Sequence, residues 1–219
     1  GTLVVHSLEA GATWEYSTDG GTGWSTGTGT TFDLTANTTY AAGLIRVRQT
    51  DLADNLSAEA SNSASITVDT VDPVAPSFSL VSDTGGNASD GYTSNDNISV
   101  SGVEGTATWQ YSTNGGSTWT NGSASTFEIA EGAYAAGQIQ VRQTDLAGNT
   151  GPVSTNGATI TVDQTVAPPT FALAADTGGS GSDGITSNGL INVFGVEAGA
   201  TWEYTTNSGG GWTTGTGSS

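Results

Sequence analysis

The 219-residue sequence contains no cysteine, no methionine and no lysine, and its positive charge rests on three arginines. Without cysteine the chain has neither disulfide bonds nor thiolate chemistry. The arginines are opposed by 21 acidic residues, which gives a formal net charge of −18. Such a surface repels the phosphates of nucleic acids, so we expect no nucleic acid partner. Dense carboxylates also repel one another, and calcium is the natural cation to relieve that repulsion.

Long apolar runs and helical periodicity are also missing. No apolar stretch approaches the roughly 18 residues that a membrane helix needs, so we expect no direct membrane insertion. No segment of helical length repeats its apolar residues every 3.6 positions. The sequence contains no nucleophile elbow, no P-loop, and no His or Cys cluster suited to zinc. We therefore expect that the chain is not an enzyme.

Internal repeats dominate what is present. The segment GATWEYSTDGG (residues 11–21) returns as TATWQYSTNGG (106–116) and as GATWEYTTNSG (199–209). VRQTDLADN (47–55) returns as VRQTDLAGN (141–149), and the Pro-containing linker after ITVD also recurs. The three copies predict tandem repeats of about 94 residues, which is typical of a modular array.

The linkers set the predicted domain boundaries. Residues 1–72 form a repeat without its first strand, residues 73–166 form a complete repeat, and residues 167–219 form the N-terminal part of a third. Two explanations fit these incomplete ends. The chain is a window from a longer array, or neighbouring copies complete its end repeats.

Within one repeat the strand signals follow a period of two. SFSLVS, NISVSGV, TWQYST, STFEIA, QIQVRQT and ATITVD alternate apolar and polar residues, and clusters of Gly, Asn, Asp and Ser separate them. Six or seven short strands in about 94 residues predict an all-β fold of tandem immunoglobulin-like antiparallel β-sandwiches. Trp109 stands where such folds place a core tryptophan, although the usual cysteine pair is absent.

Taken in order, the linker VDxTxxP, the segment DTGxxxSDGxTSN, the ATWEYSTDGG strands and the terminal VRQTDLAGN resemble the bacterial Ig-like repeats of giant surface adhesins. These repeats form the extender regions of RTX-type, type I-secreted and biofilm-associated adhesins. The resemblance covers the whole chain and implies a calcium-stiffened extracellular spacer on the bacterial cell surface. It does not imply that this segment itself binds a host or a substratum.

The topology of a seven-stranded sandwich predicts where a cation would bind. The loop carrying Asp145 and Asn149 and the turn carrying Glu104 should lie beside linker residues Asp69 and Asp72. Oxygen ligands from two repeats would then converge, as calcium requires. The corresponding ligands elsewhere in the chain are predicted to be Glu9, Asp51 and Asn55 in the first repeat, and Asp163 and Glu197 at the next junction.

A second candidate lies in the Gly-rich segment near the start of each repeat. It supplies Asp83 and Asp90 in one copy and Asp176 and Asp183 in the next. Residues 178–186 also fit the calcium-binding nonapeptide of β-rolls, but that motif needs immediate tandem repetition, which is missing here. A local calcium site is therefore the hypothesis, and a β-roll is not.

Each of these features also has a structural interpretation. Asp and Asn in loops commonly cap their own backbone as Asx-turns. Trp119 and Trp212 could stack on sugars, but such residues more often cover the edge of a sandwich. Arg48 and Arg142 should point outward and pair with acidic side chains, which contributes little stability. His6 occurs once and is expected to be solvated or structural.

The function expected from the sequence is that of a structural spacer in a surface adhesin or biofilm protein, stiffened by calcium between repeats. Its partners would be the neighbouring repeats of the same chain. One alternative is a self-assembling filament or surface-layer subunit in which other copies complete the end repeats. Another is a carbohydrate-binding repeat array.

Overall fold

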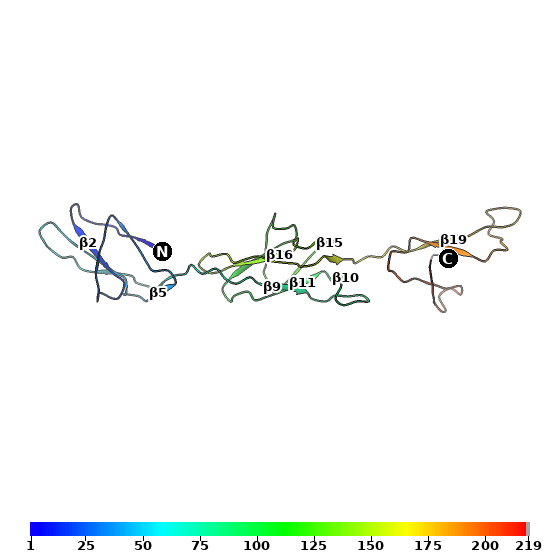
Figure 1. Cartoon of the computed structure of the whole chain (residues 1–219), viewed down its shortest axis with the longest axis horizontal. Coiled ribbons are helices and arrows are strands. Elements are labelled where there is room, and N and C mark those ends of the chain that lie inside the picture. Colours follow the sequence, from blue (N-terminus) through cyan, green and yellow to red (C-terminus); the bar gives the residue numbers. More distant parts are fainter. Residues whose placement is uncertain (218–219) are drawn as a thin grey trace. The chain divides into compact units, whose positions relative to one another are not determined.

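The computed structural model describes residues 1–217 and is all-β (Figure 1). Across that range no residue lies in a helix, so nothing described there is a helix long and apolar enough to cross a membrane. The strands have two to five residues because Gly, Asn, Asp and Ser clusters interrupt the alternating segments. The chain divides into two compact units, Gly1–Val162 and Asp163–Ser219, which are described separately.

The second repeat contains three small sheets. The longest has the order β13-β12-β16-β17, and the other two have the orders β14-β11-β9 and β10-β18-β15. The strands are β9 (Ser77–Leu80), β10 (Tyr92–Thr93), β11 (Asn97–Ser101), β12 (Thr108–Ser112), β13 (Thr120–Asn121), β14 (Thr126–Glu128), β15 (Gly132–Tyr134), β16 (Gln140–Thr144), β17 (Ser154–Thr155) and β18 (Ile160–Val162). All pairs are antiparallel except β10 with β18, which is parallel.

The first repeat follows the same plan from its first described strand onward. Its sheets have the orders β3-β2-β6-β7, β1-β4 and β5-β8. The strands are β1 (Thr2–Val4), β2 (Thr13–Ser17), β3 (Ser25–Thr26), β4 (Thr31–Asp33), β5 (Thr38–Tyr40), β6 (Arg46–Thr50), β7 (Ala60–Ser61) and β8 (Ile66–Val68). Trp14 pairs with Gln49 across β2 and β6 just as Trp109 pairs with Gln143 across β12 and β16.

The second compact unit contains two described strand pairs. β19 (Thr170–Leu173) pairs with β20 (Ile191–Phe194), and β21 (Glu203–Tyr204) pairs with β22 (Thr213–Thr214). The first pair repeats the register of β9 with β11. Phe171 remains 76% exposed, whereas the corresponding Phe78 packs against a buried core.

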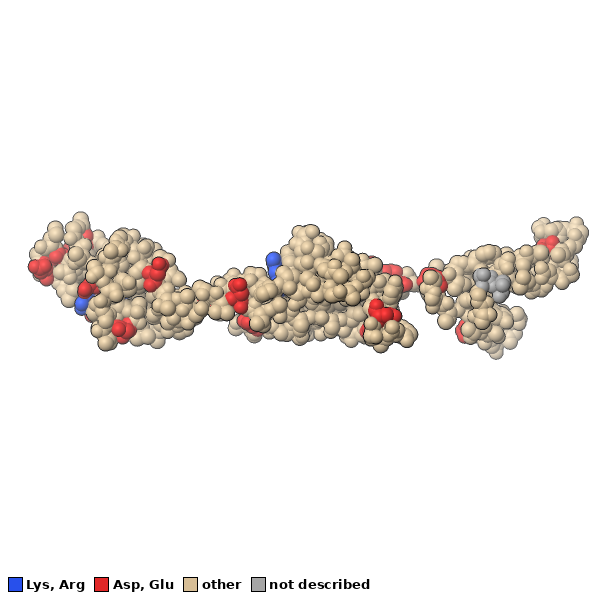
Figure 2. Space-filling view, viewed as in Figure 1, with Lys and Arg blue, Asp and Glu red and all other residues tan. Residues whose placement is uncertain are grey.

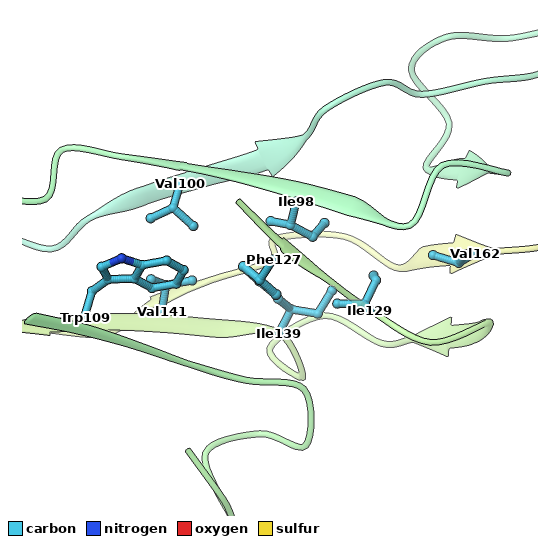
Figure 3. Close-up of a cluster of buried hydrophobic side chains, with 8 residues drawn as sticks. All are labelled: Ile98, Val100, Trp109, Phe127, Ile129, Ile139, Val141 and Val162. Atoms are coloured by element: carbon cyan, nitrogen blue, oxygen red, sulfur yellow. The ribbon is translucent and has the colours of Figure 1, made fainter. Parts of the chain in front are cut away.

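Two separate hydrophobic cores lie within the first unit. The core of the second repeat contains Ile98, Val100, Trp109, Phe127, Ile129, Ile139, Val141 and Val162. In Figure 3, Ile98 and Val100 face Trp109 and Val141 from the opposite layer of strands. Burying each of these side chains contributes roughly 1.5–3 kcal/mol. The core of the first repeat contains Trp14, Phe32, Leu34, Tyr40, Ile45 and Val68.

These features confirm the predicted all-β class with layered antiparallel sheets. The boundaries drawn from the linkers at residues 72/73 and 166/167 stay predictions, and the third predicted segment, 167–219, ends on two residues outside the described range.

Candidate junction site

The turn between β16 and β17, residues 145–149, is closed by its own side chains. Asp145 Oδ1 accepts a hydrogen bond from the Asn149 backbone N–H at 2.8 Å, and Asp145 Oδ2 accepts one from Asn149 Nδ2 at 2.8 Å. Gly148 has a φ of 94°, a conformation that glycine adopts without strain. The Asp and Asn of this motif therefore form the Asx-type turn that the structural interpretation expected.

The first repeat builds the same turn from residues 51–55. Asp51 Oδ1 accepts from the Asn55 backbone N–H at 2.8 Å, and Asp51 Oδ2 accepts from Asn55 Nδ2 at 2.9 Å. Asp54 takes the place of Gly148 and has a φ of 63°. Aspartate tolerates this conformation better than most residues do, which explains why the motif accepts either residue at this position.

These hydrogen bonds stabilise the charged form of both aspartates. The side-chain amide of Asn149, followed by backbone N–H groups, lowers the pKa of Asp145 below its ordinary value. Asn55 lowers the pKa of Asp51 in the same way. Both carboxylates are therefore ionised at neutral pH. Figure 2 shows acidic side chains scattered over the face in view, with few basic ones among them.

The turn of the second repeat also contacts the end of the first. Asn149 Nδ2 donates a hydrogen bond to the backbone carbonyl oxygen of Asp69, 3.2 Å away. Asp69 follows β8 directly, and its Oδ1 accepts from the Val71 backbone N–H at 3.0 Å. The predicted proximity of Asn149 to the linker is therefore present, and it is made through a backbone oxygen of Asp69. Asp72 is exposed on the same linker.

Gln143 is the residue of this region that the sequence reasoning missed. Its side chain is fully buried, and its Nε2 donates to the carbonyl oxygens of Val74 at 2.7 Å and Gly102 at 3.2 Å. Its Oε1 accepts from the backbone N–H of Glu104 at 2.9 Å. Gln143 thus joins the incoming linker to the turn that carries Glu104, and it places the Glu104 backbone without using the Glu104 carboxylate.

The linker is seated by two further contacts. The Ser154 hydroxyl donates to the carbonyl oxygen of Pro76. Gly151 lies so close to the linker that a Cβ atom added there would stand 2.1 Å from the Pro73 carbonyl oxygen. At the matching position the first repeat has Ser57, whose backbone N–H donates to Gln49 just as that of Gly151 donates to Gln143. Glycine is therefore required at position 151, beside Pro73 of the linker.

The remaining predicted junction ligands make local contacts. Glu9 donates its backbone N–H to Gln49 Oε1 at 2.9 Å, as Glu104 does to Gln143. In the second compact unit, Asp163 Oδ1 accepts from the Thr165 backbone N–H at 3.3 Å, and Glu197 Oε1 accepts from the Ala167 backbone N–H at 3.1 Å. Both acidic side chains thus bind backbone groups of the second linker.

The Gly-rich loops, residues 83–91 and 176–184, use their aspartates alike. Asp83 Oδ2 accepts from the Gly91 backbone N–H and Asp176 Oδ2 from that of Gly184, both at 3.0 Å. Asp90 and Asp183 are exposed and accept from the backbone N–H two residues later, also at 3.0 Å. Each pair of predicted ligands therefore belongs to one closed loop.

No group of three or more acidic or histidine side chains suited to a metal ion occurs within residues 1–217. Calcium also binds carbonyl and amide oxygens, so fewer carboxylates can suffice when backbone oxygens complete the shell. Calcium binding at the predicted residues stays a prediction.

The arginines of the long sheets point outward, as expected. The Arg48 guanidinium lies 3.8 Å from the ring centroid of Trp24 and pairs with Glu15 at 2.9 Å. Arg142 lies 3.9 Å from the ring centroid of Trp119, but it bonds to Gln110 rather than to an acidic side chain. A guanidinium thus covers one face of Trp119, which weakens the carbohydrate-binding alternative at that residue, whereas Trp212 is 61% exposed.

The hydrogen bonds of this site can fix a linker against a folded repeat, and its ionised carboxylates can attract cations. No protein-family model matches the chain, and no curated protein shows significant sequence similarity to it.

Proposed function

We propose that the chain is a spacer segment of a bacterial cell-surface adhesin or biofilm protein, built from tandem immunoglobulin-like repeats. The contact between Asn149 and Asp69 is the observation that carries this proposal, because it ties the end of one repeat to a turn of the next. Gln143 adds a buried bond to linker residue Val74. A linker held at several points transmits orientation from one repeat to the next, as a spacer requires.

Calcium at the junction is part of the proposal. The carboxylates of Asp145, Asp69 and Asp72 are oxygen ligands of the type that calcium prefers. The fixed turn holds Asp145 in its ionised form, which favours cation binding. A bound ion would neutralise like charges on the linker and the turn and so limit bending at the joint.

Small-angle scattering of the full chain tests the mechanical role. In calcium we expect a larger maximum dimension and a narrower distribution of distances than after chelation. Asp145→Asn should remove most of this response, and Asp51→Asn serves as the matched control in the first repeat. If chelation changes neither the maximum dimension nor the melting temperature, calcium stiffening is rejected.

A second candidate function is self-assembly into a filament or surface layer. It is favoured by the exposure of Phe171 and Phe194, at 76% and 52%, on the β19–β20 pair. Sedimentation that rises with protein concentration would support assembly, and a monomer at all concentrations would exclude it.

A further inference from the structure

The indole N–H of Trp109 lacks the partner that its two counterparts have. Trp14 Nε1 donates to the Gly29 carbonyl oxygen at 3.0 Å, and Trp202 Nε1 donates to the Gly217 carbonyl oxygen at 3.0 Å. For Trp109 Nε1 the described residues provide no acceptor, although only 7% of this residue is exposed. A buried indole N–H normally finds an acceptor, so this donor is open to whatever fills the space beside it.

One substitution in the loop between β13 and β14 explains the difference. The position of Gly29 and Gly217 is occupied by Ala124 in the second repeat. Both glycines have a positive φ, 64° and 68°, and Ala124 does not adopt this conformation, which is costly for a residue with a Cβ atom. The loop of the second repeat therefore takes a different path and leaves the indole N–H without its carbonyl acceptor.

A cavity of about 420 Å³ lies beside this donor. Its walls include the apolar side chains of Val100, Val103, Ala107 and Ala124 together with Trp109. In Figure 3 the indole nitrogen lies on the side of the ring that faces Val100, which is part of the cavity wall. Pockets for small organic molecules have volumes of about 300–1,000 Å³, so this cavity suits a ligand at the lower end of that range.

Hydrogen bonds hold the walls of the cavity in place. Gln143 Nε2 donates to the Gly102 carbonyl oxygen at 3.2 Å, and Gln143 Oε1 accepts from the Glu104 backbone N–H at 2.9 Å. Gly102 and Glu104 both line the cavity, as do Val100 and Ser125, which are joined by a backbone hydrogen bond of 2.8 Å. The cavity is therefore preformed, and a ligand does not have to order its walls.

The chemistry of the walls selects the class of ligand. A water molecule inside a protein needs two to four polar partners, which mostly apolar walls do not supply. A molecule with an apolar body and one carbonyl oxygen would cover the apolar side chains and accept from the indole N–H. The exposed Glu104 lines the cavity of a chain whose net charge is −18, so anions are disfavoured.

We propose that the second repeat binds a small uncharged organic molecule in this cavity, with the Trp109 indole N–H donating to a carbonyl oxygen of the ligand. The first repeat does not share the site, because its Trp14 N–H is already bonded to Gly29. The site lies inside a single repeat, so the proposal is independent of the spacer function and of calcium at the junction.

Nuclear magnetic resonance of the full chain tests the proposal, because each indole N–H gives its own signal and Trp109→Phe assigns that of Trp109. Cyclohexanone, a neutral ring with one carbonyl oxygen, is the probe. It should shift the Trp109 signal in a saturable manner, with the millimolar affinity that so few heavy atoms allow, while the Trp14 and Trp202 signals stay in place. Cyclohexanecarboxylate has the same ring but is an anion at neutral pH, and it should produce no saturable shift.

Reciprocal substitutions identify the loop residue that opens the site. Ala124→Gly should return the carbonyl acceptor to the indole and weaken cyclohexanone binding about fivefold or more, the effect of one neutral hydrogen bond. This variant should fold, because glycine occupies the position in the other two repeats. Gly29→Ala should free the Trp14 N–H and give its signal a shift with cyclohexanone that the wild type lacks.

Two results would overturn the proposal. In the first, cyclohexanone at its solubility limit leaves the Trp109 signal unmoved, which would mean that the cavity holds water only. In the second, cyclohexanone binds the wild type and Ala124→Gly with equal affinity, which would mean that the free indole N–H takes no part in binding.

Discussion

Asn149 and Asp69 are 80 positions apart in the sequence, and the Asn149 side-chain amide donates to the Asp69 carbonyl oxygen. The same amide closes the turn through Asp145 Oδ2. One side chain thus links the local geometry of a turn to the position of a linker. Any change that opens the turn should also release the linker.

The variant Asn149→Ala tests this coupling. A hydrogen bond of this kind contributes roughly 0.5–1.5 kcal/mol, so the linker should open about two- to tenfold more often. Hydrogen exchange at the amides of Thr70 and Val71 measures that opening. Asn55→Ala is the matched control, because among described contacts the Asn55 side chain binds Asp51 alone. Equal exchange at the linker in both variants would contradict the coupling.

Gln143→Leu should destabilise the second repeat more than Gln49→Leu destabilises the first. The Gln143 side chain is fully buried, and its removal leaves the Val74 and Gly102 oxygens and the Glu104 N–H unpaired. We expect a loss of about 2 kcal/mol, typical of buried groups left without partners. Gln49 is only partly buried, so Gln49→Leu should lower the free energy of unfolding by about half as much. Hydrogen exchange of the amides in β12 and β2 reports each repeat separately.

Much of this joint could be predicted from sequence because local patterns determine it. The spacing of Asp145 and Asn149 suits a turn, and alternation placed Arg142 on the outer face. The same alternation puts Gln143 on the side of buried Val141, and this signal identifies Gln143 as a core residue. Its partners could not be inferred, because Val74 and Gly102 are brought to it only by the packing of separate segments.

The candidate metal ligands show a second limit of prediction from sequence. Composition and recurrence select Asp83 and Asp145 equally well as candidate ligands. Whether a carboxylate oxygen is satisfied depends on side-chain torsions and on neighbouring backbone groups, which no spacing rule specifies. Both oxygens of Asp145 are bonded to Asn149, whereas Oδ1 of Asp83 is not satisfied.

Asp19 of the first repeat corresponds to Asn114 of the second, and this difference predicts that acid destabilises the two repeats to different extents. Hydrogen bonds from the Gly23 backbone, and then from the Ser17 hydroxyl, lower the pKa of Asp19 below its ordinary 3.8. The folded state then favours the ionised form, so Asp19 contributes stability above about pH 4 that is lost as the pH falls through its lowered pKa. Asn114 occupies the matching position in the second repeat, and its Oδ1 accepts a hydrogen bond from the Ser112 hydroxyl at 2.8 Å.

Exchanging Asp19 and Asn114 between the two repeats isolates the contribution of the Asp19 carboxylate to the pH dependence of stability. Asp19→Asn should fold normally and reduce the loss of stability of the first repeat between pH 5 and pH 2, whereas Asn114→Asp should introduce such a loss in the second. Urea unfolding at several pH values, followed by hydrogen exchange in β2 and β12, measures both. An unchanged acid response in both variants would contradict the assigned role of Asp19.

Gly122 is expected to be among the least replaceable residues of the second repeat. A Cβ atom added there would lie 2.0 Å from the Trp109 ring, and the same overlap arises at Gly27 with Trp14 and at Gly215 with Trp202. Trp109 is buried between two layers of strands (Figure 3), so its ring must shift against its core neighbours to make space. Gly122→Ala should therefore cost about 3 kcal/mol, at the upper end for overpacking.

Gly157→Ala is the matched control for that substitution. No atom lies within 4 Å of a Cβ added at Gly157, and its φ is not positive, so the change should stay within about 0.5 kcal/mol of neutral. Hydrogen exchange of the amides in β12 compares the free energy of unfolding of the two variants, because β12 carries Trp109 and belongs to the second repeat. Equal stability of the two variants would mean that the Trp109 indole can shift within the core, and the close contact would then have no energetic role.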